Sequence, residues 1–226
     1  MKKKLWLGIM VVILGIMVIG CDNPTRGNGA NGTGFRLVSF ALIDPGAPTA
    51  HWSFHYDTDG WLVQVNNYSD GNRISYNRHT RNSAGLRLRT DTFADSDSSL
   101  ISRTELEWEN NLLKRSRFYL YWDSQFELLQ VTEFTFYGDR KIKRESFDID
   151  NERTLIAIFQ YDSSGRRTGV QIQHFGGGDI IGTITGTRTY NANGTLSSVS
   201  YSDGRSRTFV WEEIAAREDM DLFFVF

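Results

Sequence analysis

Tyr161-Asp-Ser-Ser-Gly165 is the clearest copy of a unit that recurs between Trp122 and Trp211. In each copy an aromatic residue precedes two to four small polar residues and a Gly or Asn, which is the chemistry of a tight turn between β-strands. The same unit returns at Tyr190-Asn-Ala-Asn-Gly194 and Tyr201-Ser-Asp-Gly204. Looser copies, which keep only part of the pattern, are Trp122-Asp-Ser-Gln, Tyr137-Gly-Asp, Phe147-Asp-Ile-Asp-Asn151 and Phe175-Gly-Gly-Gly-Asp179. These repeated turns predict a chain of strands joined by short connections.

The spacing of the turns predicts how the strands are arranged. Steps of about 11 to 15 residues leave room for a strand of roughly nine or ten residues and a short connection. Short connections force neighbouring strands to be antiparallel. The aromatic and turn anchors are Phe93, Trp108, Trp122, Phe136, Phe147, Tyr161, Phe175, Tyr190 and Tyr201. We therefore expect an all-β antiparallel up-and-down meander of about twelve strands, either an open curled sheet or a soluble barrel.

The two ends of this domain are also predicted to be strands, with a short helical segment before the last one. Residues 35–43 form an apolar strand-like segment that ends at the turn Asp44-Pro45-Gly46. Residues 212–219 predict a short helical connector, and the alternating apolar residues 220–226 predict a last strand.

Composition excludes several classes of protein. The chain has 226 residues, 40% of them hydrophobic, and a formal net charge of −2. Its first twenty residues hold three Lys and no acid, so the rest carries −2 − 3 = −5, which gives no electrostatic reason to bind nucleic acid. A single Cys excludes an intramolecular disulfide and a cysteine-based zinc cluster.

The N-terminus predicts export and a lipid anchor. Met1-Lys-Lys-Lys4 is followed by an apolar run that ends at Gly20, as in a signal peptide, and the run is short for a membrane-spanning helix. The sequence Val18-Ile19-Gly20-Cys21 resembles the bacterial lipobox. That resemblance implies cleavage before Cys21 and acylation of its sulfur and its new amine, which gives stable anchoring. An uncleaved anchor, or a plain secretory signal with a chance Cys, is the alternative.

These features divide the chain into three parts. Residues 1–20 are the predicted lipoprotein signal peptide, residues 21–34 are the lipidated Cys and a flexible Gly/Asn-rich tether, and residues 35–226 are the β-repeat domain. The expected location is the bacterial cell envelope, with the domain lipid-anchored to the outer membrane on its periplasmic or surface face.

The turn unit also resembles the YD repeat of the Rhs and teneurin proteins. Tyr161-Asp162-Ser-Ser-Gly165-Arg166 matches that repeat, and Tyr56-Asp57-Thr-Asp-Gly60-Trp61 matches it nearly as well. The resemblance covers about half of the mature chain and implies a β-sheet that curls into a shell or a display surface, with no catalytic role for the repeat itself. Convergence on a common turn chemistry is the alternative.

No motif in the chain predicts an active site, a metal or a cofactor. His51 and His55 share a strand face but lie about 13 Å apart, too far to bind one metal, and His79 and His174 stand alone. The Asp residues of Asp57-Thr-Asp59-Gly60 are explained by turn chemistry, because the further ligands of a calcium loop are missing.

Three alternating carboxylates are the remaining candidates for chemistry. Glu105, Glu107 and Glu109 share one strand face, and a close pair of carboxylates in a cleft could hydrolyse glycosides. A solvated strand face opposite Arg115 and Arg117 is the simpler interpretation.

The strand faces and the C-terminus give opposite indications about a membrane barrel. Residues 141–147 carry charge on both faces, which a lipid-facing strand does not tolerate, whereas the terminal Phe226 resembles the assembly signal of outer-membrane barrels. We therefore expect a lipid-anchored envelope protein with a non-catalytic binding or display role toward a glycan or a protein. An outer-membrane barrel or pore component, and a glycan-processing enzyme, are the alternatives.

Overall fold

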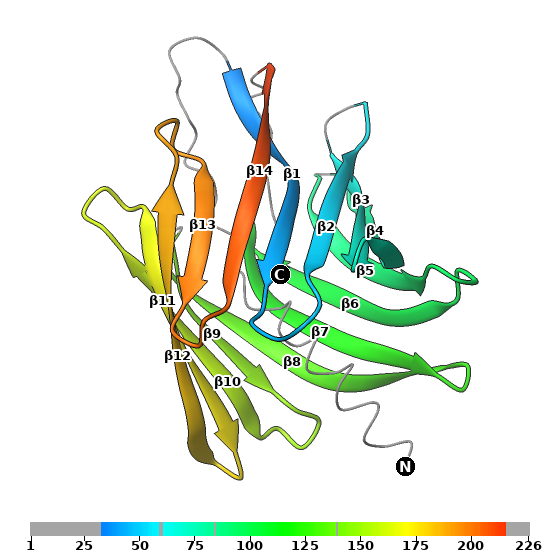
Figure 1. The fold of residues 1–226 in the computed structure, drawn as a ribbon. Helices are drawn as coiled ribbons and strands as arrows, with labels where there is room; N and C mark the ends of the chain where they lie inside the picture. The colour runs from blue at the N-terminus through cyan, green and yellow to red at the C-terminus, as the bar shows by residue number, and fades with distance from the viewer. Residues whose placement is uncertain (1–32, 59–60, 84, 139, 216–226) are drawn as a thin grey trace.

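The chain folds into one closed barrel of fourteen antiparallel β-strands (Figure 1). The computed structural model describes residues 33–58, 61–83, 85–138 and 140–215. Each strand pairs with its neighbours in sequence, and the first strand pairs with the last to close the barrel. The strands are β1 (Thr33–Ile43), β2 (Ala50–Tyr56), β3 (Leu62–Ser69), β4 (Asn72–Arg81), β5 (Arg87–Ala94), β6 (Leu100–Glu109), β7 (Leu112–Trp122), β8 (Gln125–Tyr137), β9 (Arg140–Phe147), β10 (Arg153–Tyr161), β11 (Arg167–Gly176), β12 (Asp179–Tyr190), β13 (Leu196–Tyr201) and β14 (Ser206–Ala215).

The predicted all-β antiparallel meander is confirmed, with fourteen strands rather than about twelve and a closed barrel rather than an open sheet. Closure comes from the pairing of β1 with β14, which runs from Thr33 opposite Ala215 to Ile43 opposite Ser206. This pairing removes the two exposed edges that an open sheet would leave.

The predicted helix over residues 212–219 is wrong for residues 212–215, which are the end of β14. Ala and Glu favour a helix locally, but pairing with β1 gives these residues a ladder of backbone hydrogen bonds that a local propensity does not outweigh. Thr33 and Gly34, which the sequence placed in the tether, begin β1. The lipobox, Cys21, the rest of the tether and residues 220–226 lie outside the described residues.

Nowhere in the described chain is there a helix of the length and hydrophobicity that a membrane crossing requires.

The predicted turns end the strands as expected. Tyr161, Tyr190 and Tyr201 are the last residues of β10, β12 and β13. After Tyr161, the Oδ1 atom of Asp162 accepts hydrogen bonds from the backbone N–H groups of Ser164 at 3.0 Å and Arg166 at 2.9 Å. Gly165 has φ +85°, a conformation that a side chain disfavours. The polar residues of the unit therefore satisfy the turn, and the Gly permits it.

A side chain near the end of the second strand, aromatic in five cases and Arg81 in one, joins the two strands of most hairpins at the end away from the turn. In six of the seven hairpins that join an odd strand to the next even strand, a side chain near the end of the second strand donates a hydrogen bond to a backbone carbonyl in the first half of the first strand. These bonds run from Tyr56 to Leu37, Arg81 to Leu62, Trp108 to Arg87, Tyr161 to Lys141, Tyr190 to Arg167 and Trp211 to Leu196. We call these contacts the rim latches.

Loss of one rim latch is expected to have a small, measurable cost. Tyr161→Phe removes the hydroxyl that donates to the Lys141 carbonyl at 2.6 Å and leaves that part-buried acceptor without this donor. The expected decrease in the free energy of unfolding is about 0.5–1.5 kcal/mol, measured by urea denaturation. Tyr137→Phe is the matched control, because Tyr137 is 79% exposed and should change stability by less than about 0.5 kcal/mol. Equal effects of the two variants would contradict the latch.

The interior of the barrel is filled by side chains that alternate with outward-facing ones along each strand. One apolar cluster spans the closure, around Leu37, Phe40, Trp52, Phe54, Leu62 and Val65. A second cluster joins β10 and β11 through Leu155, Ala157, Phe159, Val170 and Ile172. Between and beside these clusters the inward positions carry polar and basic side chains, and those positions contain the candidate site.

Candidate functional site

The outer wall of the barrel carries ion pairs that link neighbouring strands. Arg117 and Arg115 on β7 lie 3.0 and 3.8 Å from Glu107 on β6, and Arg115 lies 2.7 Å from Glu133 on β8. The hydroxyl of Tyr119 donates to Glu105 at 3.2 Å. The interpretation of the glutamates as a solvated face opposite arginines is therefore confirmed.

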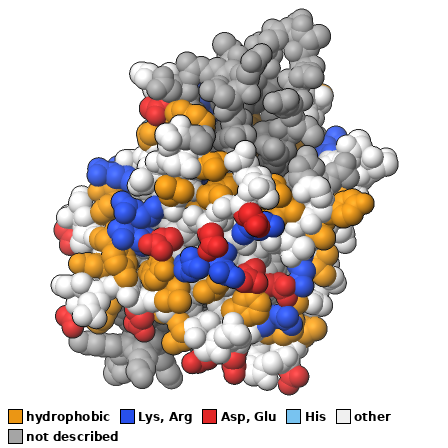
Figure 2. All heavy atoms as spheres, turned by 180° about the vertical axis from the view of Figure 1, so that it is seen from behind, with side chains coloured by type: hydrophobic (Ala, Val, Ile, Leu, Met, Phe, Trp, Pro, Cys, Tyr) orange, Lys and Arg blue, Asp and Glu red, His pale blue; other side chains and the backbone are white. Residues whose placement is uncertain are grey.

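Two further groups extend the charged surface on both sides of this network. Asp91 on β5 pairs with Arg89 at 3.0 Å and with Arg103 at 2.7 Å. Glu145 on β9 pairs with Lys143 at 2.7 Å and with Arg153 at 3.0 Å. The face opposite the view of Figure 1 shows acidic, basic and hydrophobic side chains intermixed (Figure 2).

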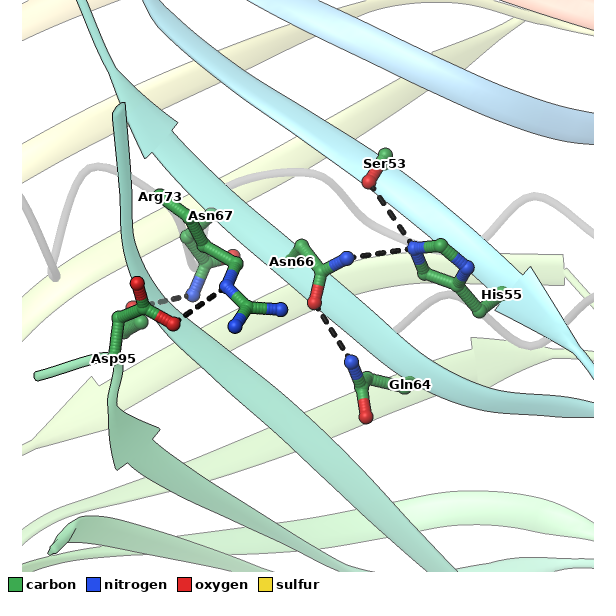
Figure 3. Close-up of polar contacts among 8 residues, drawn as sticks. Ser53, His55, Gln64, Asn66, Asn67, Arg73 and Asp95 are labelled. Carbon is green, nitrogen blue, oxygen red and sulfur yellow. Dashed lines mark hydrogen bonds and ion pairs between the residues drawn. The ribbon is translucent and has the colours of Figure 1, made fainter. Parts of the chain in front are cut away.

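The predicted shared face of His51 and His55 is outward, on β2. The Nε2 atom of His55 lies 2.6 Å from the Nδ2 atom of Asn66 and 3.4 Å from the Ser53 hydroxyl (Figure 3). His51 packs against the ring of Tyr68. No group of three or more potential His, Cys, Asp or Glu ligands occurs within the described part of the chain.

Asp57 has the predicted turn role, because its Oδ1 atom accepts a hydrogen bond from the N–H of Trp61 at 2.8 Å. Asp59 and Gly60 lie outside the described residues.

The inner wall of the barrel is the unexpected feature. Among the described residues, six charged side chains are buried, and five of them are basic: Arg87, Lys141, Arg144, Arg167 and Arg207, against the single carboxylate of Asp91. Asp91 forms ion pairs with Arg89 and Arg103 on the outer wall. Its carboxylate is therefore not a partner for the cations of the lumen. The buried charged side chains that face the lumen are therefore basic in the part of the chain that the structure describes.

Two of these cations follow the rim turns and lie against aromatic rings. The Nζ atom of Lys141 is 4.6 Å from the ring centre of Phe134, and the guanidinium of Arg167 is 3.8 Å from that of Phe159. Desolvated contacts of this kind compensate a buried cation by about 2 kcal/mol.

Arg144, in the middle of β9, is placed differently. It lies opposite Phe134 on β8 and Ala157 on β10, it is only 4% exposed, and its Nε atom has no hydrogen-bond partner. Burial, reinforced by the positive charges of Arg167 and Arg207, lowers the pKa of Arg144 to about 10. We call Arg144, Arg167 and Arg207 the lumenal arginine cluster.

Burial and nearby positive charges also affect Arg207, within the cluster, and His174 beside it. Burial lowers the pKa of Arg207, and the nearby Arg205 and Arg188 lower it further, while Tyr201 acts in the opposite direction. Burial, Arg205 and Arg144 together lower the pKa of His174. The region therefore presents several positive charges in a desolvated setting, which is the electrostatic condition for holding an anion.

The sequence did not predict this cluster. It showed charge on both faces of residues 141–147, but no single position marked Arg144 as buried. A basic residue follows the turn at Arg87, Lys141 and Arg167, and the structure buries all three. This signal could have found Arg167, but it does not mark Arg144 or Arg207.

His79 on β4 lies beside a second basic region of the lumen. Its Nδ1 atom is 2.9 Å from the Thr90 hydroxyl. Burial lowers the pKa of His79 well below its usual value, and Arg87 and Arg81 lower it further. The folded protein therefore holds this imidazole neutral at pH values where the unfolded chain binds a proton.

A pH dependence of stability follows from this difference. As pH falls below about 6.5, the unfolded chain takes up a proton that the fold excludes at His79, so the free energy of unfolding should fall by up to about 1.4 kcal/mol per pH unit. His79→Gln should make this slope shallower, although His174 acts in the same direction. Urea denaturation between pH 7 and 5 measures both slopes, and equal slopes would contradict the assignment.

Comparisons with known proteins show a limited likeness. No protein-family model and no curated protein matches the chain. Among solved structures, a porin-like protein from Bacteroides uniformis superposes with a TM-score of 0.47 at 9% identity, covering 78% of this chain and 98% of that one. The Photorhabdus luminescens Tc holotoxin pore gives a TM-score of 0.18 at 9% identity, and S. aureus TarM gives 0.20 at 16% identity.

The alignments with the toxin and with TarM cover 72% and 56% of this chain but only 14% and 20% of those proteins. These likenesses are too weak to carry a function, and what the chain does is inferred from its own barrel.

Proposed function

We propose that this chain is a lipid-anchored protein of the bacterial cell envelope whose barrel stands in water and has a non-catalytic binding role. The observation that carries the proposal is the set of ion pairs on the outer wall from β5 to β10. A Lys or Arg on the lipid face of a barrel costs about 2–4 kcal/mol at the bilayer midplane, so a wall with this many charges in mid-strand favours water.

The rest of the outer wall supports the same proposal. From β11 to β14 most of the outward positions in mid-strand are polar and uncharged, although Ile181 and Val210 are exposed aliphatic residues on these strands. The polar positions are Gln171, Gln173, Thr183, Thr185, Thr187, Ser198, Ser200 and Thr208. Such a surface has little to gain from a hydrocarbon environment. The tether and Cys21 then supply the attachment to the membrane.

The non-catalytic role is supported by the position of the acidic residues. Glu105 and Glu107 are engaged by Tyr119, Arg115 and Arg117 on an outer wall, and the buried charges of the lumen are basic. In the described part of the chain these two glutamates are therefore engaged by neighbouring side chains, rather than facing each other as the two carboxylates of a glycoside hydrolase do.

An outer-membrane barrel is the second candidate, and one observation favours it. The closed barrel has an even number of antiparallel strands, and several large aliphatic side chains are exposed, including Ile43, Val63, Ile74, Leu88, Ile142, Ile158 and Val210. Ion pairs separate these residues on β5 to β10, so we favour the lipid-anchored form.

Cys21→Ser distinguishes the two candidates. In a detergent phase-separation assay the wild-type protein should enter the detergent phase, and it should incorporate labelled palmitate. The variant should incorporate no label and should move to the aqueous phase, because the barrel itself has no reason to enter a micelle. A variant that stays in the detergent phase as a folded species would favour the membrane barrel.

A further inference from the structure

We infer that the lumenal arginine cluster is an oxyanion site, and that its ligand belongs to the phosphate class. This inference rests on the proposed binding role, and it names where in the barrel a ligand is held and by which chemistry.

The first argument is the unmatched buried charge at Arg144. Its guanidinium is almost fully desolvated, and no described residue forms an ion pair with it. The groups that act on it most strongly are Arg167 and Arg207, both of the same sign. Buried charges in proteins are nearly always paired, and a bound ion is one of the explanations for a buried polar group without a partner.

The second argument is the position of the three arginines in the fold. Arg144 lies on β9, Arg167 begins β11, and Arg207 lies on β14, where it is opposite Val199 on β13. These strands are separated along the sheet, and the charges of Arg167 and Arg207 nevertheless act on the buried Arg144. A barrel that only needed a filled interior would use apolar residues here, as β10 and β11 do with Ala157, Phe159 and Ile172.

The third argument selects the class of anion. Guanidinium groups bind carboxylate and phosphate through paired N–H donors, and such charge-assisted bonds are strong when desolvated. Several like charges around one place favour a ligand with more than one negative charge, and phosphate carries about two near neutral pH whereas a carboxylate carries one.

The inference is tested by titrating inorganic phosphate into the mature protein in a mild non-ionic detergent, at pH 7.5 and constant ionic strength, by isothermal calorimetry. We expect saturable binding at one site per barrel. Arg144→Gln should weaken binding at least tenfold, and Arg144→Lys should give an intermediate affinity because it keeps the charge without the paired donors. Sodium acetate should bind at least tenfold more weakly than phosphate.

Arg117→Gln is the matched control, because it removes one Arg from the outer wall, where Arg117 pairs with Glu107. Its affinity for phosphate should stay within twofold of the wild type. Far-UV circular dichroism checks that each variant is folded. The inference is overturned by absence of saturable binding, by equal losses in the Arg144 and Arg117 variants, or by an Arg144→Gln variant that binds normally. Because the protein is in detergent throughout, these results do not depend on whether lipid or the barrel holds it at the membrane.

Discussion

Phe40→Ala is expected to lower the free energy of unfolding by about 3–5 kcal/mol, the range found when a large aromatic side chain is deleted from a core. Phe40 is 2% exposed and stacks on Trp52 with 4.4 Å between ring centres. It also contacts Phe54 and, across the closure, Phe209 on β14. The deletion therefore leaves a cavity at the seam where the first and last strands meet.

Urea denaturation followed by circular dichroism measures this effect. Tyr137→Ala serves as the comparison, because Tyr137 is an aromatic residue outside the core and its loss should cost less than about 0.5 kcal/mol. A Phe40→Ala variant that loses under 1 kcal/mol would show that the closure does not depend on this cluster.

Arg144→Met is expected to raise the free energy of unfolding by about 1–4 kcal/mol in the absence of phosphate. Met fills a similar volume, and it avoids the desolvation penalty of several kcal/mol that a buried ion carries. The lowered pKa of Arg144, about 10, reports the same cost of keeping the guanidinium charged in the lumen.

The sign of this result separates a ligand site from a structural one. If Arg144 held the barrel together, its replacement would be destabilising, whereas a residue kept for binding is retained at a cost to stability. Addition of phosphate should reduce the difference in free energy of unfolding between Arg144→Met and the wild type, because only the wild type is stabilised by the ligand. Loss of stability in Arg144→Met without phosphate would contradict the account.

Much of the fold followed from the sequence because its turns are chemically explicit. Units such as Tyr161-Asp-Ser-Ser-Gly165 specify a turn, and their spacing specifies antiparallel neighbours. The closure of the barrel and the buried arginine could not be predicted in this way. Pairing of β14 with β1 overrides the helical propensity of residues 212–215, and such long-range pairing leaves no local mark.

The burial of Arg144 was not predicted because β-bulges change which residues of a strand face the lumen. Strict alternation would place Lys141, Lys143 and Glu145 on one face. A β-bulge between Thr135 and Phe136 shifts the register, so that Lys141 and Arg144, three residues apart, are both buried. Arg167 and Val170 show the same spacing beside a bulge at Gln160. Bulges change which residues face the lumen, and sequence periodicity does not reveal them.

The most direct test of a barrel that stands in water is to express residues 23–226 without lipid or detergent. Size-exclusion chromatography and far-UV circular dichroism should then show a soluble, β-rich monomer with a cooperative unfolding transition. Aggregation in water, with recovery of a heat-resistant β-structure only after detergent is added, would contradict the account and would favour a barrel that inserts into the membrane.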